Sequence, residues 1–490
     1  MKAKTSARLL AALLLLSSML AACAKAEEQP KETTPPIAAD TTSGESDTEE
    51  FPAPEIEDMK GATLTILNYR KDSFTWANTT ILVEEATGDA FNDALYNRES
   101  RVEYLYNCSI EENQPTDLLG TLNKTVAAQD DAYDVAMVFD ANVATVLLAD
   151  VLMSWDALDL DFSKPWWDSA ATEQYNFYGI QAAVTGAYSL YNYSTRHTLL
   201  FNDNMKRDLN ISDDFYQVVR DGKWTLDAMY QYAAVAVNDV NGDGKMRPTD
   251  DCYGTTGTVT RYYSALLTGA NIHYIDRMED GTLYYALVGN EFAQSFISKL
   301  VEMNTGNDIF TSGTSDIGGS NETIFPNGRA LFLVDYVGMT EKIRDLDFDI
   351  GFLPPPKYDE NQTSYYSLVE GGAQSVLPKS IVAEDFHRIA VILDAFAYYS
   401  YKESIPAYID ILLKSKVARN EESAEMLQLV FDHSAYDLGT GVWSAETKNM
   451  FTQNIFLPRK NEVASLVAKT EKPLDRKLER FTEAVQELAK

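Results

Sequence analysis

Short apolar runs alternate with amphipathic segments along most of the chain. Runs of strand length occur at residues 62–67 and 133–139, and apolar residues recur at helical spacing in the segments 89–107, 118–128 and 142–152. Asp89 stands at the start of the first of these helical segments, where an Asp side chain can cap a helix. The alternation predicts an α/β fold with a mostly parallel sheet, in which ligands bind beyond the carboxyl ends of the strands.

A second pattern occupies residues 325–378. Apolar runs at 330–334 and 348–353 are followed by three consecutive prolines, and two further runs lie at 365–369 and 373–377. Proline lacks the N–H that a central strand or a helix needs, so the chain must leave this sheet in an extended form. The pattern therefore predicts a crossing between two separate sheets, and hence two lobes with a chain that returns to the first.

Length and charge narrow the class of protein. A chain of 490 residues is too long for one hydrophobic core. Its formal net charge of −33 disfavours nucleic acid as a partner, because phosphate binding relies on clustered cations. The 28 Tyr, 21 Phe and 6 Trp are numerous enough to supply stacking faces for uncharged ligands as well as core.

The N-terminus has the pattern of a secretory signal. Three basic residues precede an apolar run at 9–20, which is too short to span a membrane as a helix. The run ends in Leu20-Ala21-Ala22-Cys23, which resembles a bacterial lipobox. That resemblance implies removal of residues 1–22 and lipidation of Cys23. The alternatives are a signal without a lipid and an uncleaved membrane anchor.

Residues 23–57 are rich in Glu, Thr, Ser, Pro and Ala and contain almost no large apolar side chain. Such a segment buries too little surface to fold, so we expect a solvated tether. No later stretch approaches about twenty uninterrupted apolar residues. The sequence thus predicts a globular body tethered to the outer face of the cytoplasmic membrane.

The sharpest local motif is an Asp-x-Asn-x-Asp-Gly sequence that begins at Asp239. Counted from Asp239, it matches a calcium-binding loop with Gly244 at the sixth position and a carboxylate at the twelfth. The predicted ligands are Asp239, Asn241, Asp243, the carbonyl of Lys245, and Asp250. Asp in place of Glu at the twelfth position is similar to dockerin-type loops and favours one structural Ca²⁺. The alternative is an Asx-rich surface turn without a metal.

Other chemistry is sparse in the sequence. The four histidines are scattered, and no zinc-protease, nucleophile-elbow, Walker or dinucleotide motif occurs. The adjacent Trp166 and Trp167 fit either a sugar-stacking surface or a core corner. We expect Cys108 and Cys252 to remain free thiols, because a disulfide between two lobes would restrain their motion.

The order of several segments carries a family resemblance. These are TLTILN, YDVAMVFD, LDLDFSKPWWD, DGKWTLDAMYQYA, FPNGRALFLVDY and DIGFLPPPKYDENQ. Together with the lipobox they resemble the large, lipid-anchored extracellular solute-binding proteins of bacterial ABC importers, of the family 1 type. Most characterised members of that family bind sugars or oligosaccharides. The resemblance spans residues 60–460 and implies a two-lobed periplasmic-binding fold of type II that closes over its ligand by hinge motion.

The same resemblance implies three hinge crossings. It places them near residues 191–198, 354–364 and 404–410. The N-lobe would then comprise residues 58–190 plus 365–405, and the C-lobe residues 195–355 plus 410–490.

The resemblance also implies residues that line the cleft between the lobes. In the N-lobe these are Asn68, Tyr69, Asp140 and Glu370, and in the C-lobe Thr260, Arg261, Tyr262, Asp335, Tyr336 and Trp443. Carboxylates accept hydrogen bonds from sugar hydroxyls, Arg donates them, and aromatic rings cover apolar sugar faces. Each residue also has a structural reading: Arg261 can pair with an acid, and Tyr336 can belong to the core.

The implied function is a non-catalytic receptor that delivers a carbohydrate to the permease subunits of an ABC transporter. The alternatives are a cell-surface glycan-active enzyme, an adhesin, or a binding protein for a peptide or another polar solute. The sequence favours the receptor because it contains no recognisable nucleophile–base or metal–water constellation.

Overall fold

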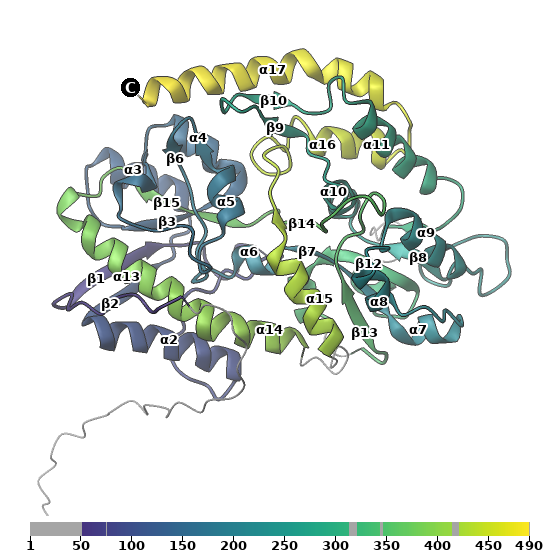
Figure 1. Ribbon diagram of the computed structural model, residues 1–490, viewed down its shortest axis with the longest axis horizontal. Coiled ribbons are helices and arrows are strands. Elements are labelled where there is room, and N and C mark those ends of the chain that lie inside the picture. The colour runs from purple at the N-terminus through teal and green to yellow at the C-terminus, as the bar shows by residue number, and fades with distance from the viewer. Residues whose placement is uncertain (1–50, 75, 313–320, 344–345, 414–420, 490) are drawn as a thin grey trace, which may run out of the picture. The chain divides into compact units, whose positions relative to one another are not determined.

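The computed structural model describes residues 51–74, 76–312, 321–343, 346–413 and 421–489 (Figure 1). The predicted signal peptide, Cys23 and residues 23–50 of the predicted tether lie outside the described residues. Within the described part of the chain, no helix combines the length and the apolar character that crossing a bilayer requires.

The N-lobe is built on a five-stranded sheet with the order β2-β1-β3-β15-β4. Its strands are β1 (Ala62–Leu67), β2 (Cys108–Asn113), β3 (Val135–Phe139), β4 (Leu152–Met153) and β15 (Ala373–Pro378). β1 is parallel to β2 and β3, whereas β15 returns late in the sequence and is antiparallel to β3 and β4. The return of the chain to its first sheet agrees with the pattern of residues 325–378.

The helices α2 (Ala90–Tyr106), α3 (Leu118–Ala127) and α4 (Val143–Leu148) connect successive strands of the N-lobe sheet. From the returning chain, α13 (Phe386–Tyr399) packs against α2 and β1. The Asp89 carboxylate accepts from the N–H groups of Phe91 and Asn92 at the start of α2. Asn107 ends the helix in the left-handed conformation, with φ of 46°. The predicted helix at 89–107 is therefore confirmed to within one residue at each end.

The C-lobe is built on a second five-stranded sheet with the order β11-β8-β12-β7-β13. Its strands are β7 (His197–Asn202), β8 (Tyr253–Thr256), β11 (Phe310–Thr311), β12 (Ala330–Tyr336) and β13 (Ile350–Leu353). β12 is buried at every position and lies between β8, to which it is parallel, and β7, to which it is antiparallel. Its continuous apolar run fits a central strand covered on both faces.

The remaining elements cover these two sheets and join them. The helices are α5 (Ser169–Gln174), α6 (Tyr191–Ser194), α7 (Asp203–Asp208), α8 (Phe215–Arg220), α9 (Leu226–Val235), α10 (Val259–Gly269), α11 (Glu291–Met303), α12 (Asn321–Ile324), α14 (Ile405–Leu413), α15 (Glu421–Asp432), α16 (Lys448–Phe451) and α17 (Val463–Leu488). The short strands are β5 (Asn176–Phe177), β6 (Ile180–Gln181), β9 (Ile275–Arg277), β10 (Leu283–Tyr285), β14 (Ser367–Leu368) and β16 (Ser434–Ala435).

Three chain segments pair with one another between the two sheets. Arg196 forms an antiparallel bridge with Val369, and β14 is parallel to β16. The first of these segments lies inside the predicted crossing at 191–198. The pairing holds these three segments together beside the hinge, where short strands can bend while their hydrogen bonds persist.

The second predicted crossing, at 354–364, lies before the place where the chain leaves the C-lobe. The triple-proline segment packs on the C-lobe, where Trp224 Nε1 donates to Pro354 O at 2.9 Å and Lys357 N donates to Trp224 O. The chain therefore crosses later, at β14. Residues 405–410 lie in α14, which contacts α2 of the N-lobe and, through the hydrogen bond from Tyr408 to Glu341, the C-lobe. The next helix, α15, packs on β13 of the C-lobe, so the chain passes between the lobes along α14, where the third crossing is expected.

The long helix α17 contacts both lobes. It packs on α11 and β10 at one end and on α4 at the other, and Figure 1 shows it in yellow across the top. Its apolar face includes Leu474 and Phe481, and the Phe481 ring meets Phe177 at 5.1 Å. Any hinge motion therefore has to be accommodated along α17.

The adjacent tryptophans form a buried corner of the N-lobe. Trp166 Nε1 and Trp167 Nε1 both donate to one carboxylate oxygen of Asp394 on α13, at 2.6 and 3.2 Å. Lys164 Nζ donates to the other oxygen at 2.8 Å. Both indoles are nearly inaccessible, so of the two interpretations of this pair the structure supports the core corner.

Candidate functional site

Polar and aromatic side chains gather where the strands of both lobes end. Asp140 follows β3, and Gly371 precedes the antiparallel β15, so both lie at the same edge of the N-lobe sheet. In the C-lobe, Tyr336 ends β12, and Arg261 lies in the first turn of α10, which follows β8. Ligands of open α/β sheets bind at such edges.

Asp140 is locked to the chain at the start of β15. One of its carboxylate oxygens accepts from Gly371 N at 2.9 Å, and the other accepts from Ala141 N. Burial raises the pKa of Asp140 to about 6, against the lowering effect of these hydrogen bonds. Asp140 thus fixes the position of the loop that faces the C-lobe.

Gly371 is the point at which the two lobes approach each other. Trp76 Nε1 donates to Gly371 O at 3.2 Å, and Gly371 has a φ of +74°. A Cβ atom at position 371 would lie 3.3 Å from Tyr336 Oη and 3.4 Å from Trp76 Nε1. The site therefore needs glycine here for its conformation and for the close approach of two aromatic side chains from different lobes.

On the C-lobe side, Arg261 joins two predicted site residues. Its Nη1 donates to Asp335 Oδ1 at 2.7 Å, and its guanidinium carbon lies 4.1 Å from the centre of the Tyr336 ring. Burial raises the pKa of the Asp335 carboxyl, although the Arg261 guanidinium opposes this shift. Arg261 therefore holds Tyr336 by a cation–π contact while it neutralises Asp335.

A second charged cluster lies beside the hinge strands. Lys448 Nζ on α16 donates to Glu370 Oε1 at 2.5 Å, and His197 Nε2 lies 3.8 Å from Glu370 Oε2. Burial alone would raise the pKa of Glu370, but Lys448, with His197 and Arg261, holds it below its usual value. Burial also lowers the pKa of His197 to about 4, so the imidazole is neutral at pH 7.

Several buried polar atoms of these clusters have no hydrogen-bond partner among the described residues. They are His197 Nδ1 and Nε2, Glu370 Oε2 and Asp335 Oδ2. Leaving such groups unpaired is costly, and polar ligands commonly satisfy them. His197, Asp335 and Glu370 are buried, so these unpaired atoms lie behind the surface that a ligand would meet.

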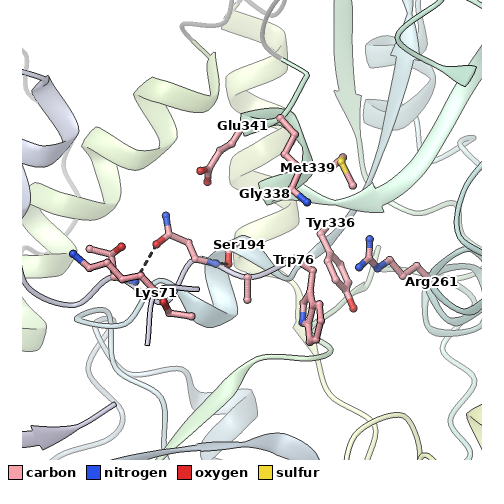
Figure 2. Close-up of a pocket in the computed structure, with 13 residues that line it drawn as sticks. Lys71, Trp76, Ser194, Arg261, Tyr336, Gly338, Met339 and Glu341 are labelled. Atoms are coloured by element: carbon pink, nitrogen blue, oxygen red, sulfur yellow. Dashed lines mark hydrogen bonds between the residues drawn. The ribbon is translucent and has the colours of Figure 1, made fainter. Parts of the chain in front are cut away.

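A cavity of about 230 Å³ opens between the lobes beside these residues (Figure 2). The N-lobe and the first hinge segment contribute Lys71, Trp76, Ala77, Asn78, Thr79, Thr80 and Ser194, and the C-lobe contributes Arg261, Tyr336, Gly338, Met339, Glu341 and Lys342. Figure 2 shows the side chains of Trp76 and Tyr336 next to each other, with Arg261 beyond Tyr336. The cavity combines two aromatic rings with charged groups.

Five of the ten predicted cleft residues lie at this site: Asp140, Arg261, Asp335, Tyr336 and Glu370. Arg261 and Tyr336 line the cavity itself, and the other three support its walls.

The other five predicted residues do not line the cavity. Asn68 is fully buried and donates to Thr79 O and Glu112, and Tyr69 packs on Phe74. The amide group of Asn68 and the ring of Tyr69 thus already contact neighbouring residues of the N-lobe. Asn68 and Tyr69 therefore brace the loop after β1.

In the C-lobe, Tyr262 is fully buried and shares a hydrogen bond with Tyr230. Trp443 packs edge-on against Phe481 of α17, and Thr260 is a partly buried residue of α10. These contacts give Tyr262 and Trp443 structural roles. A strand-end rule cannot separate such residues from those that face the cleft, because adjacent residues in a helix point in different directions.

Sequence reasoning missed several residues of the site. In the sequence, Trp76 lies in a polar stretch after the run at 62–67 and belongs to no motif, although an aromatic residue after a strand end is a usable signal. His197 and Lys448 had no such signal. Both reach Glu370 from elements far away in the sequence, β7 and α16.

The predicted calcium loop folds into a series of tight turns. Asp239 accepts from the N–H groups of Gly242 and Gly244, and Asn241 accepts from Asp243 N. Asp243 is also paired with Arg247 at 2.6 Å. These are the turns that the motif predicts.

The acidic groups of this loop do not converge. The buried Asp251, rather than Asp250, closes the loop by accepting from Val240 N and Arg247 N. In the part of the chain that the structure describes, no group of three or more His, Cys, Asp or Glu is arranged to hold a metal ion. Calcium binding would therefore require Asp243 to exchange Arg247 for the ion and Asp250 to turn inward, and it stays a prediction.

If the loop binds Ca²⁺, chelation should lower the melting temperature by about 1 to 3 °C, because the ion stabilises only the folded state. Asp243→Ala should abolish this response. Asp221→Ala, which removes an exposed carboxylate elsewhere, is the control. Equal melting of wild type and Asp243→Ala with and without chelator would contradict calcium binding.

No family model matches this chain, and no curated protein matches it in sequence. Solved structures do match. The sugar-binding protein MalE from the phytopathogen Xanthomonas citri aligns with a TM-score of 0.57 and 14% identity, over 86% of this chain and 98% of that one. A sugar transporter from Rhizobium etli in an open conformation aligns with a TM-score of 0.55 and 11% identity, over 87% and 99%.

An ABC substrate-binding protein from Listeria monocytogenes, in complex with cycloalternan, aligns with a TM-score of 0.53 and 13% identity, over 85% of this chain and 99% of that one. The chain has the two-lobed periplasmic-binding-protein fold. This confirms the predicted α/β class, the two lobes and the type II architecture. At such low identity the likeness establishes the fold alone.

Proposed function

We propose that this protein captures a sugar or oligosaccharide between its two lobes and delivers it to the permease subunits of an ABC importer. The observation that carries the proposal is the approach of Trp76 from the N-lobe and Tyr336 from the C-lobe across Gly371. Two neighbouring aromatic side chains, one from each lobe, in one cavity suit the apolar faces of a sugar ring.

The charged groups around the rings support a polyhydroxylated ligand. Lys71, Arg261 and Glu341 line the cavity. Carboxylates accept hydrogen bonds from sugar hydroxyls, and cations donate to them. The structural neighbours add support, because their names describe proteins that bind cycloalternan and maltotetraose.

We also propose that the protein is a lipoprotein outside the cytoplasmic membrane. Support comes from the Leu20-Ala21-Ala22-Cys23 sequence and the polar segment that follows it. If Cys23 carries the lipid, Cys23→Ser should move the protein from the membrane fraction to the medium. Retention in the membrane fraction would instead indicate an uncleaved helix.

Thermal shift and calorimetry of the purified protein against a panel of saccharides and peptides test the proposed binding. A saccharide should raise the melting temperature, and Tyr336→Ala should weaken its binding about tenfold through loss of a stacking contact. A hydrolysis assay on the same saccharides addresses the alternative of a glycan-active enzyme. Turnover of the ligand, or binding of peptides but no saccharide, would overturn the proposal.

A further inference from the structure

We infer that the saccharide bound by this protein is anionic, carrying a carboxylate or an ester-linked sulfate. The inference rests on the proposed function and specifies the class of ligand for the same cavity. The charges that line the cavity are mostly positive, whereas the net charge of the whole chain is negative.

Four charged side chains line the cavity, and three of them are cations: Lys71, Arg261 and Lys342. Glu341 is the fourth. The whole chain has the opposite balance, with 41 Lys and Arg against 74 Asp and Glu. A random part of this surface would therefore be acidic. A cationic wall inside an acidic protein attracts an anion into the cavity while the remaining surface repels it.

Each acid near the cavity pairs with at least one protein donor, although Asp335 and Glu370 each keep one buried oxygen without a hydrogen-bond partner among the described residues. Asp335 pairs with Arg261, and Glu370 pairs with Lys448. Glu341 accepts from Tyr408 Oη at 2.8 Å, and Asp140 accepts from Gly371 N behind the cavity. When these acids and their partners are included, the region contains as many cations as acids. Each of the acids, however, pairs with a cation or accepts a hydrogen bond from the protein.

Lys71 is the cation best placed to meet a ligand. It is exposed and lines the cavity from the loop after β1, and among the described residues its Nζ reaches only Leu82 O, at 3.5 Å. A hydrogen bond of that length is weak, so the ammonium group can turn to a ligand at little cost. Arg261 faces the cavity from the other lobe, and Figure 2 shows Lys71 and Arg261 on opposite sides of Trp76 and Tyr336.

An anionic sugar would use both features of the site. Its ring would lie against Trp76 and Tyr336, and its charged group would meet the lysines or Arg261. A neutral sugar would use the rings and leave the Lys71 ammonium group in contact with solvent. Charge-assisted hydrogen bonds are about twice as strong as neutral ones, so the charged ligand gains more from this cavity.

Calorimetry of the purified protein tests the inference with galacturonic acid, glucuronic acid and glucose 6-sulfate as anionic probes, and with galactose and glucose as their neutral counterparts. At least one anionic probe should bind about tenfold or more tightly than its neutral counterpart. Its affinity should fall as salt is added, because salt screens exposed charges. The uronates and the sulfate distinguish the two sources of charge.

Lys71→Met keeps the length of the side chain and removes its charge. It should weaken binding of the anionic probe about tenfold and leave binding of a neutral probe unchanged, and Lys71→Arg should restore binding. Lys124→Met, which removes an exposed cation on α3 far from the cavity residues in sequence, is the matched control.

Tighter binding of neutral saccharides, or an anionic probe unaffected by both salt and Lys71→Met, would overturn the inference and leave the proposed function standing. A protein that binds no saccharide of either class would overturn the proposed function, and this inference with it.

Discussion

Replacement of Asp394 by alanine is expected to lower the free energy of unfolding by about 3 to 5 kcal/mol, the cost of removing one partner of a buried ion pair. The carboxylate holds together three donors: Trp166 Nε1, Trp167 Nε1 and Lys164 Nζ. Without it, two buried indole N–H groups lose their acceptor and an ammonium group loses its counterion. The corner that covers α13 would then contain several unsatisfied donors.

Urea unfolding, monitored by tryptophan fluorescence and by circular dichroism, measures this effect. Asp394→Asn keeps one acceptor for the indoles and loses the charge opposite Lys164, so it should fall between wild type and Asp394→Ala. Glu384→Ala, which removes an exposed carboxylate just before the same helix, is the control and should change stability by less than about 0.5 kcal/mol. Equal midpoints for Asp394→Ala and Glu384→Ala would contradict the structural role of this corner.

The same corner shows what a sequence can and cannot predict. Local periodicity predicted the strands and helices of the N-lobe, because each depends on residues close together in the chain. The partner of Trp166 and Trp167 lies 228 and 227 residues away, on a helix of the returning chain. No local pattern reveals which of many acids will receive two indoles, so the tryptophans were equally consistent with a sugar platform.

The hinge likewise depends on contacts between residues far apart in the sequence, which local patterns do not reveal. The three prolines correctly signalled that the chain leaves a strand, since β13 ends at Leu353. They could not show how far the chain runs before it crosses, because Pro354 and Lys357 are held on the C-lobe by Trp224. β16, which pairs with β14 beside the hinge, has only two residues, too few for any periodicity to appear.

In the site, residues at strand ends were predictable and residues that complete it were not. Asp140 and Tyr336 follow directly from the ends of β3 and β12. Trp76 and Lys448 reach the site through long-range packing, and their roles depend on Gly371 and Glu370. Local sequence patterns could therefore not predict these residues, because they come together only in the folded two-lobed protein.

His197 is expected to make the stability of the protein depend on pH. The imidazole is fully buried, lies against the Tyr336 ring at 4.9 Å, and faces Glu370. Burial lowers its pKa to about 4, with Arg261 and Lys448 acting in the same direction and Glu370 opposing them. In the unfolded chain the pKa returns to about 6.5.

The sign of the effect follows from these two values. As pH falls below about 6.5, the unfolded chain binds a proton at His197 that the folded protein does not, so stability is lost progressively until pH reaches about 4. Between about pH 7 and about pH 5 this amounts to about 2 kcal/mol. Asp140 acts in the opposite direction, because burial raises its folded pKa to about 6 and protonation then favours the folded state.

A comparison of wild type with His197→Phe isolates the histidine, because Asp140 contributes equally to both proteins. The phenyl ring keeps the contact with Tyr336 and lacks the titrating nitrogens, neither of which has a hydrogen-bond partner among the described residues. The unfolding free energy of wild type should fall about 2 kcal/mol further than that of His197→Phe when the pH is lowered from about 7 to about 5. His197→Gln replaces the imidazole by a polar side chain that does not titrate, and its unfolding free energy should depend on pH as that of His197→Phe does. Parallel pH profiles for all three proteins would show that His197 titrates normally in the folded state, and a wild type that gains stability over His197→Phe as the pH falls would show that it is protonated against Glu370. Either result would rule out the neutral buried imidazole at the hinge.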